Sequence, residues 1–219
     1  MRACSVVSYS FVILWIIACQ TPLSMEFPRQ EYWMFIGVIQ VLSEPLILSF
    51  SDSKTLGIAE TVCALGMLAT ALVIGVTGIR KNQARVLGTA LALAGLFMIV
   101  FSLRENILLI CVSGFLFFAM LPPANSSLDY LARINIPDEL QGRAWGFIGF
   151  LSQLGYIPAY ALAGVLADRA AAAMKVTVGR GAALVIAVSG LLLIAVSGLS
   201  LASPRIRTLE TGQERDIRD

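Results

Sequence analysis

The chain has 219 residues, of which 58% are hydrophobic and only 14% are charged, a composition far from that of an ordinary soluble domain. It contains no histidine, which excludes Ser–His and Cys–His hydrolases and zinc proteases with an H-E-x-x-H motif. The formal net charge of +2 is too small to indicate a protein that binds nucleic acid. Composition therefore predicts an all-α protein of the polytopic membrane class.

The four cysteines stand apart, each within apolar sequence, at Cys4, Cys19, Cys63 and Cys111. No C-x-x-C pair occurs, so the spacing indicates neither a zinc knuckle nor a redox motif. We expect the cysteines to be small buried hydrophobic residues, and the sequence predicts no metal and no cofactor.

The chain begins with a hydrophobic run, Cys4–Cys19, that is short for a membrane span of about 20 residues. It is either a signal peptide, with a positive region of Arg2 alone, or a retained seventh helix. A third alternative is that synthesis starts at Met25. We expect residues 1–31 to form an N-terminal hydrophobic helix followed by a short loop.

Six longer apolar segments follow, and we expect each to be a transmembrane helix, because only helices and closed barrels span lipid and no period-2 alternation indicates a barrel. The fourth is expected to continue through two prolines to about Leu128. The bundle is predicted to occupy residues 32–203, and residues 204–219 to form a charged tail. The segments are Trp33–Phe50, Gly57–Ile79, Val86–Leu103, Ile107–Leu121, Ala144–Ala167 and Gly181–Ser203.

The basic residues divide unequally between the two predicted faces of the membrane, and the richer face is expected to be cytoplasmic. This asymmetry places the C-terminus in the cytoplasm and favours the retained first helix, since a cleaved signal peptide would invert the arrangement. Ten basic residues lie on the cytoplasmic face, at Arg29, Arg80, Lys81, Arg85, Arg133, Arg143, Arg205, Arg207, Arg215 and Arg218. Six lie on the other, at Arg2, Lys54, Arg104, Arg169, Lys175 and Arg180.

A short internal similarity relates the second predicted span to the fifth. Gly75 and Gly164 are each followed by valine and, five positions on, by Arg80 and Arg169. The two segments end spans that exit on opposite sides of the membrane. This is the pattern of an inverted three-plus-three repeat, although glycine is frequent in membrane helices and chance similarity stays an alternative.

Two carboxylates lie within predicted spans, where a charge is costly and therefore indicates function. Glu44 is six residues before the end of the first span and Glu60 is three residues into the second, which places them about 9 and 5 Å below the outer surface. We expect them to be proton-coupling groups if both face inward. The alternative is that Glu60 reaches the interface and Glu44 bonds a neighbour.

Five further polar or aromatic residues of the spans are candidates for the lining of a substrate cavity. They could equally form hydrogen bonds between helices. These residues are Gln40, Asn125, Gln153, Tyr156 and Tyr160.

The longest polar interruption of the chain, Pro122–Gly146, carries a family resemblance. A span ending in P-x-x-N at Asn125 is followed by a loop reading I-P-x-x-x-Q-G-R, which contains Gln141, Gly142 and Arg143. This stretch resembles the connection between spans ten and eleven of major facilitator superfamily transporters, and in particular of macrolide-efflux-like bacterial drug exporters. Over residues 33–203 the chain resembles the C-terminal half of such a transporter.

A second stretch, from Gly75 to Arg85, resembles the gating loop motif G-x-x-x-D-R-x-G-R-R of the superfamily. Ile79 stands where the motif has an acid, which puts a charge-relay role in doubt. By the internal similarity, Gly164, Asp168 and Arg169 are the equivalent positions in the second repeat. Alternatively, Arg80, Lys81 and Arg85 only orient the chain and bind lipid headgroups.

The resemblance implies proton-driven efflux of small amphipathic drugs or metabolites by alternating access, and no enzymatic activity. The implied surroundings are the lipid bilayer of a bacterial inner membrane, a small-molecule substrate and a second six-helix half, either a copy of this chain or a separate chain. The alternative is a truncated, non-transporting fragment, or a small membrane partner of a full-length transporter.

Overall fold

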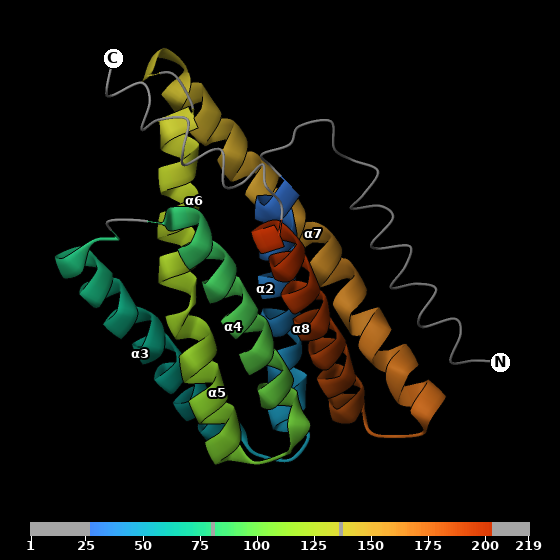
Figure 1. Ribbon diagram of the computed structural model, residues 1–219. Helices are drawn as coiled ribbons and strands as arrows, with labels where there is room; N and C mark the ends of the chain where they lie inside the picture. The colour runs from blue at the N-terminus through green and yellow to red at the C-terminus, as the bar shows by residue number, and fades with distance from the viewer. Residues whose placement is uncertain (1–26, 80–81, 136–137, 203–219) are drawn as a thin grey trace.

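The computed structural model describes residues 27–79, 82–135 and 138–202, and all regular structure in these ranges is helical, which confirms the predicted all-α class (Figure 1). The predicted seventh helix before residue 27 and the charged tail lie outside these ranges. The elements are α2 (Phe27–Leu48), α3 (Ser53–Thr77), α4 (Gln83–Leu103), α5 (Ile107–Ala119), α6 (Leu121–Asn135), the 3-10 helix η1 (Asp138–Leu140), α7 (Gln141–Met174) and α8 (Val178–Ala202).

Within the described residues, four helical stretches are long and apolar enough to cross a membrane: Ser53–Thr77, Gln83–Leu103, Ile107–Leu131 and Val178–Leu199. Trp33–Leu48 is a shorter apolar helix, and the predicted span Ala144–Ala167 lies within α7, which is not among the four. By length and composition the described helices therefore support several membrane spans, but they do not establish six.

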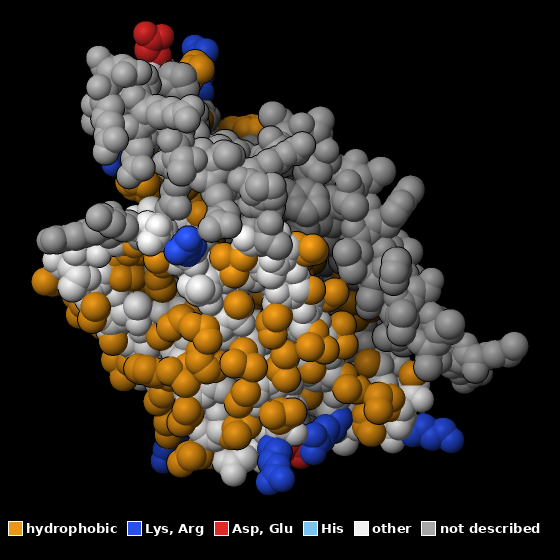
Figure 2. All heavy atoms as spheres, in the orientation of Figure 1, with side chains coloured by type: hydrophobic (Ala, Val, Ile, Leu, Met, Phe, Trp, Pro, Cys, Tyr) orange, Lys and Arg blue, Asp and Glu red, His pale blue; other side chains and the backbone are white. Residues whose placement is uncertain are grey.

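The surface agrees with a lipid environment. Hydrophobic side chains cover most of the described face in Figure 2, and Lys and Arg side chains gather at its lower edge. Helix α3 contributes strongly to the exposed apolar surface, and Val76 near its end is 88% exposed. Because exposed apolar area of this extent is unfavourable in water, the described surface is suited to contact with acyl chains.

The junction of α5 and α6 contains the two prolines, Pro122 and Pro123, within an apolar stretch that runs on to Leu131. They occupy the first turn of α6, where backbone N–H groups have no partner within the helix, so the missing N–H of proline costs little. The structure therefore agrees with a span that continues past the prolines with a break in its hydrogen bonding.

The centre of the bundle is the antiparallel pair α4 and α8, which pack through small residues spaced seven apart on each helix. Gly95 faces Gly190 so closely that a Cβ atom on Gly95 would lie 2.7 Å from the Gly190 carbonyl oxygen. One heptad away, the Ser197 hydroxyl donates a 2.5 Å hydrogen bond to the carbonyl oxygen of Gly88. Small residues permit this close backbone approach, which supplies packing and polar contacts where lipid provides no hydrophobic driving force.

In Figure 1 the remaining helices lie on either side of this pair and behind it. Helix α2 packs on α7 and α8, α3 packs on α5, and α4 packs on α5 and α6. Helix α7 packs along α8, whereas α3 makes no extended contact with α4. Helix α3 approaches α5 through a narrow stripe of buried small residues, Ala59, Cys63 and Gly66.

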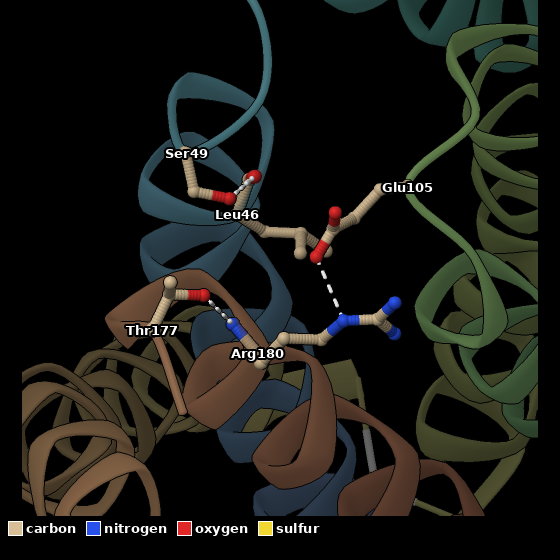
Figure 3. Close-up of polar contacts among 5 residues, drawn as sticks. All are labelled: Leu46, Ser49, Glu105, Thr177 and Arg180. Atoms are coloured by element: carbon tan, nitrogen blue, oxygen red, sulfur yellow. Dashed lines mark hydrogen bonds and ion pairs between the residues drawn. The ribbon is translucent and has the colours of Figure 1, made fainter. Parts of the chain in front are cut away.

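At the end of the bundle where α2 finishes, an ion pair joins two distant segments. The Nε atom of Arg180, in the first turn of α8, lies 2.7 Å from Oε1 of Glu105 in the α4–α5 connection (Figure 3). The two side chains are 46% and 33% exposed. In the same view, the Ser49 hydroxyl donates to the carbonyl oxygen of Leu46 at 2.7 Å, which closes the last turn of α2.

Candidate functional site

The polar and aromatic residues shared by α2 and α7 form one continuous group. The Tyr160 hydroxyl donates to Oε1 of Gln40 at 3.3 Å. The ring of Tyr156 lies 5.5 Å from that of Tyr160 and 5.7 Å from that of Trp33, measured between centroids. The group forms here because Gly37 of α2 has no side chain: a Cβ atom at that position would lie 2.8 Å from Cβ of Ala159.

Gln40 also belongs to a pocket of about 230 Å³ that opens between α2, α3, α4 and α5. Helix α3 contributes Glu60, Cys63 and Met67, which share one helical face because they are spaced three and four residues apart. The lining is mostly apolar, and its other members are Ile39, Ser43, Ile47, Ala59, Ala64, Phe101, Ile110 and Phe118.

The two predicted proton-coupling residues are placed differently. Glu60 lines the pocket, together with Gln40 and Ser43 of the facing helix. Glu44 on α2 is not among the lining residues, although its neighbour Ser43 is, and Glu44 and Glu60 are both exposed. The structure therefore brings Glu60 into a pocket, and the expected meeting of Glu44 with Glu60 stays a prediction.

The predicted cavity residues are likewise divided. Gln40 lines the pocket, and Tyr156 and Tyr160 adjoin it through the contacts of Gln40. Asn125 is half-buried on α6 and Gln153 is exposed on α7, and neither lines the pocket. The hydrogen bond between Tyr160 and Gln40 agrees with the alternative expectation, in which these polar residues join neighbouring helices.

The predicted gating residues lie at helix ends. Arg80 and Lys81 fall outside the described residues, and Arg85 is exposed in the first turn of α4. Gln141, Gly142 and Arg143 form the first turn of α7. Gly75 is near the end of α3, and Gly164, Asp168 and Arg169 lie in the last third of α7, all four of them exposed. Helices α3 and α7 end at opposite ends of the bundle in Figure 1.

The pocket includes residues that sequence reasoning did not single out, namely Ser43, Cys63, Met67, Phe101 and Phe118. The spacing of the α3 residues in the sequence could have predicted part of this set. Positions 60, 63, 64 and 67 follow the i, i+3, i+4, i+7 pattern of a single helical face, so the interest in Glu60 could have been extended to Cys63 and Met67.

The described helices indicate a membrane-embedded helical protein, and its largely apolar pocket is lined in part by the exposed residue Glu60. Comparisons of the chain with protein-family models, with curated proteins and with solved structures found no match.

Proposed function

We propose that the chain is one half of a major-facilitator-type transporter that exports small amphipathic drugs or metabolites by alternating access, driven by protons. The observation that carries this proposal is the pocket between α2, α3, α4 and α5, which is lined by Glu60 together with apolar and aromatic residues. An amphipathic molecule requires such a combination, because its apolar body fills an apolar cavity while a few polar groups orient it.

The packing of the helices supports an inverted three-plus-three repeat. If α2, α3 and α4 are matched with α5–α6, α7 and α8, the α3–α5 contact corresponds to the α7–α2 contact. The α2–α8 contact corresponds to that of α4 with α5 and α6, and the α4–α8 pair corresponds to itself. One contact departs from the repeat. Helix α7 packs along α8, whereas the equivalent pair, α3 and α4, makes no extended contact. In this arrangement, α2, α3, α4, α5–α6, α7 and α8 are the six spans.

The proposal requires a second six-helix half, either a copy of this chain in the same orientation or a separate chain. Gln40, Glu44, Glu60 and Tyr160 are exposed in the isolated chain. A carboxylate that faces lipid costs about 3 kcal/mol or more at the middle of a span and less toward its end, where Glu44 and Glu60 lie, so a second half that covers these groups would stabilise the assembly. The family resemblance implies a bacterial inner membrane for this assembly, and the charge asymmetry favours a cytoplasmic C-terminus.

Transport is tested with everted membrane vesicles that contain the chain and ethidium as an amphipathic probe. We expect ethidium accumulation that collapses when the proton gradient is dissipated, and that falls at least tenfold in Glu60→Gln. Glu105→Gln is the matched control, because Glu105 lies in a connection outside the spans. Accumulation equal to that of vesicles without the protein, for ethidium and for other amphipathic dyes, would instead support the non-transporting fragment.

A further inference from the structure

The pocket contains sulfur ligands that the proposed transport function does not use. Cys63 and Met67 are one turn apart on α3, and both line the pocket. Cys63 is a free thiol, as is Cys111 on the adjoining helix α5. The pocket is thus lined by a thiol and a thioether, with a second thiol on the helix against which Cys63 packs.

The backbones of α3 and α5 approach closely at this point, which brings the second thiol near the first. A Cβ atom on Gly114 of α5 would lie 2.5 Å from the Sγ atom of Cys63, and a Cβ atom on Gly66 would collide with the carbonyl oxygen of Phe115. Cys111 precedes Gly114 by one turn on the same face of α5.

We propose that Cys63, Met67 and Cys111 form a binding site for a soft monovalent metal ion of the Cu⁺ or Ag⁺ type, which enters through the pocket. Thiolate and thioether sulfur atoms are the ligands that such ions select, whereas hard ions such as Na⁺ and Mg²⁺ prefer oxygen. The inference rests on the pocket and on the packing of α3 against α5, and not on the proposed transport function.

The charges balance in a way that suits an apolar site. When Ag⁺ binds, a Cys63–S–Ag bond forms, the S–H bond of Cys63 breaks, and the proton passes to the buffer. The Met67 thioether and the neutral Cys111 thiol add to the metal as uncharged donors. The complex therefore carries no net charge, which avoids the cost of an uncompensated ion in apolar surroundings.

The site is tested with the full-length chain purified in detergent, in a background carrying Cys4→Ser and Cys19→Ser so that only two thiols remain. Ag⁺ is the probe, its stoichiometry is measured by elemental analysis after gel filtration, and its affinity is measured by titration. We expect one Ag⁺ per chain, and at least a tenfold loss of affinity in Cys63→Ser, in Met67→Leu and in Cys111→Ser. Met174→Leu is the matched control, because Met174 is an exposed methionine at the end of α7, and its affinity is expected to be unchanged.

The Met67→Leu variant separates a built site from a merely reactive thiol, since it keeps both cysteines and nearly the same side-chain volume. An affinity for Ag⁺ that is unchanged in both Met67→Leu and Cys111→Ser would overturn the proposal, as would binding of no Ag⁺ by the background protein. Circular dichroism spectra show whether each variant is folded, and Cys63→Ala replaces Cys63→Ser if the latter does not fold. Because no gradient or substrate is involved, failure of the metal site and failure of transport are separate results.

Discussion

Gly95 of α4 and Gly190 of α8 lie face to face, and a Cβ atom on either residue would stand within 2.7 Å of the carbonyl oxygen of the other. The contact is reciprocal, so it joins the two helices at a point where neither can accept a side chain. In an inverted repeat these two helices are equivalent, and the pair would lie near the axis that relates the halves of the chain.

The first prediction concerns this contact. Gly95→Ala and Gly190→Ala should each lower the free energy of unfolding by about 1–3 kcal/mol, because the added methyl group has to push two backbones apart. Gly198→Ala is the matched control on α8, since a Cβ atom there meets nothing within 4 Å. It should be neutral or stabilising by up to about 1 kcal/mol, the difference in helix propensity. Thermal melting in detergent, followed by circular dichroism, measures all three, and equal effects in the three variants would contradict the packing described.

A second prediction concerns the ion pair between Arg180 and Glu105. Because both side chains are partly exposed, a double-mutant cycle with Arg180→Gln and Glu105→Gln should give a coupling free energy of about 0–1 kcal/mol, which declines as salt is added. The pair is therefore expected to position α8 against the α4–α5 connection while adding little to the stability of the fold. A coupling of several kcal/mol that salt leaves unchanged would show that the pair is buried in the membrane or in an assembly.

A third prediction concerns pH and the start of α3. The Asp52 carboxylate accepts hydrogen bonds from the Thr55 hydroxyl and from the Thr55 backbone N–H, and these bonds hold the pKa of Asp52 below its ordinary value of 3.8. Since the folded pKa is lower than the unfolded one, the cap stabilises the protein fully above pH 3.8, and this stabilisation is lost as the pH falls through the lowered pKa. Thr55→Val removes the larger contribution, the hydroxyl bond. The pKa of Asp52, followed by NMR titration, should rise toward 3.8 in this variant, and an unchanged pKa would contradict the assignment.

The fourth prediction concerns orientation. Lys54, at the start of α3, and Arg143, at the start of α7, are both exposed and lie on opposite predicted faces of the membrane. In a variant without native cysteines, Lys54→Cys should react with a membrane-impermeant maleimide in intact cells. Arg143→Cys should react only after the cells are permeabilised. The reverse pattern would invert the topology drawn from the charge asymmetry.

Much of the fold could be read from the sequence alone. Continuous apolar runs predicted the helical segments, and the structure adds Asp52 and Asn106 as N-caps of α3 and α5 that accept backbone hydrogen bonds. The reason is physical and local: a segment in lipid has to satisfy its own backbone, so composition and length suffice to predict a helix. The same reasoning singled out Glu60, because a carboxylate within an apolar run is unusual wherever the helix packs.

Which helices meet, and through which faces, was decided only by the tertiary structure. Glu44 and Glu60 were both predicted to be proton-coupling groups, yet of the two only Glu60 lines the pocket. Gln40 accepts a hydrogen bond from Tyr160, which lies on a helix more than a hundred residues away in the sequence. Apolar side chains are satisfied equally well by lipid and by another helix, so hydrophobicity does not tell a buried face from a lipid-facing one. The discriminating contacts are close approaches at glycine and single hydrogen bonds, such as Gly95 with Gly190 and Ser197 with Gly88, and these depend on pairings that no local pattern records.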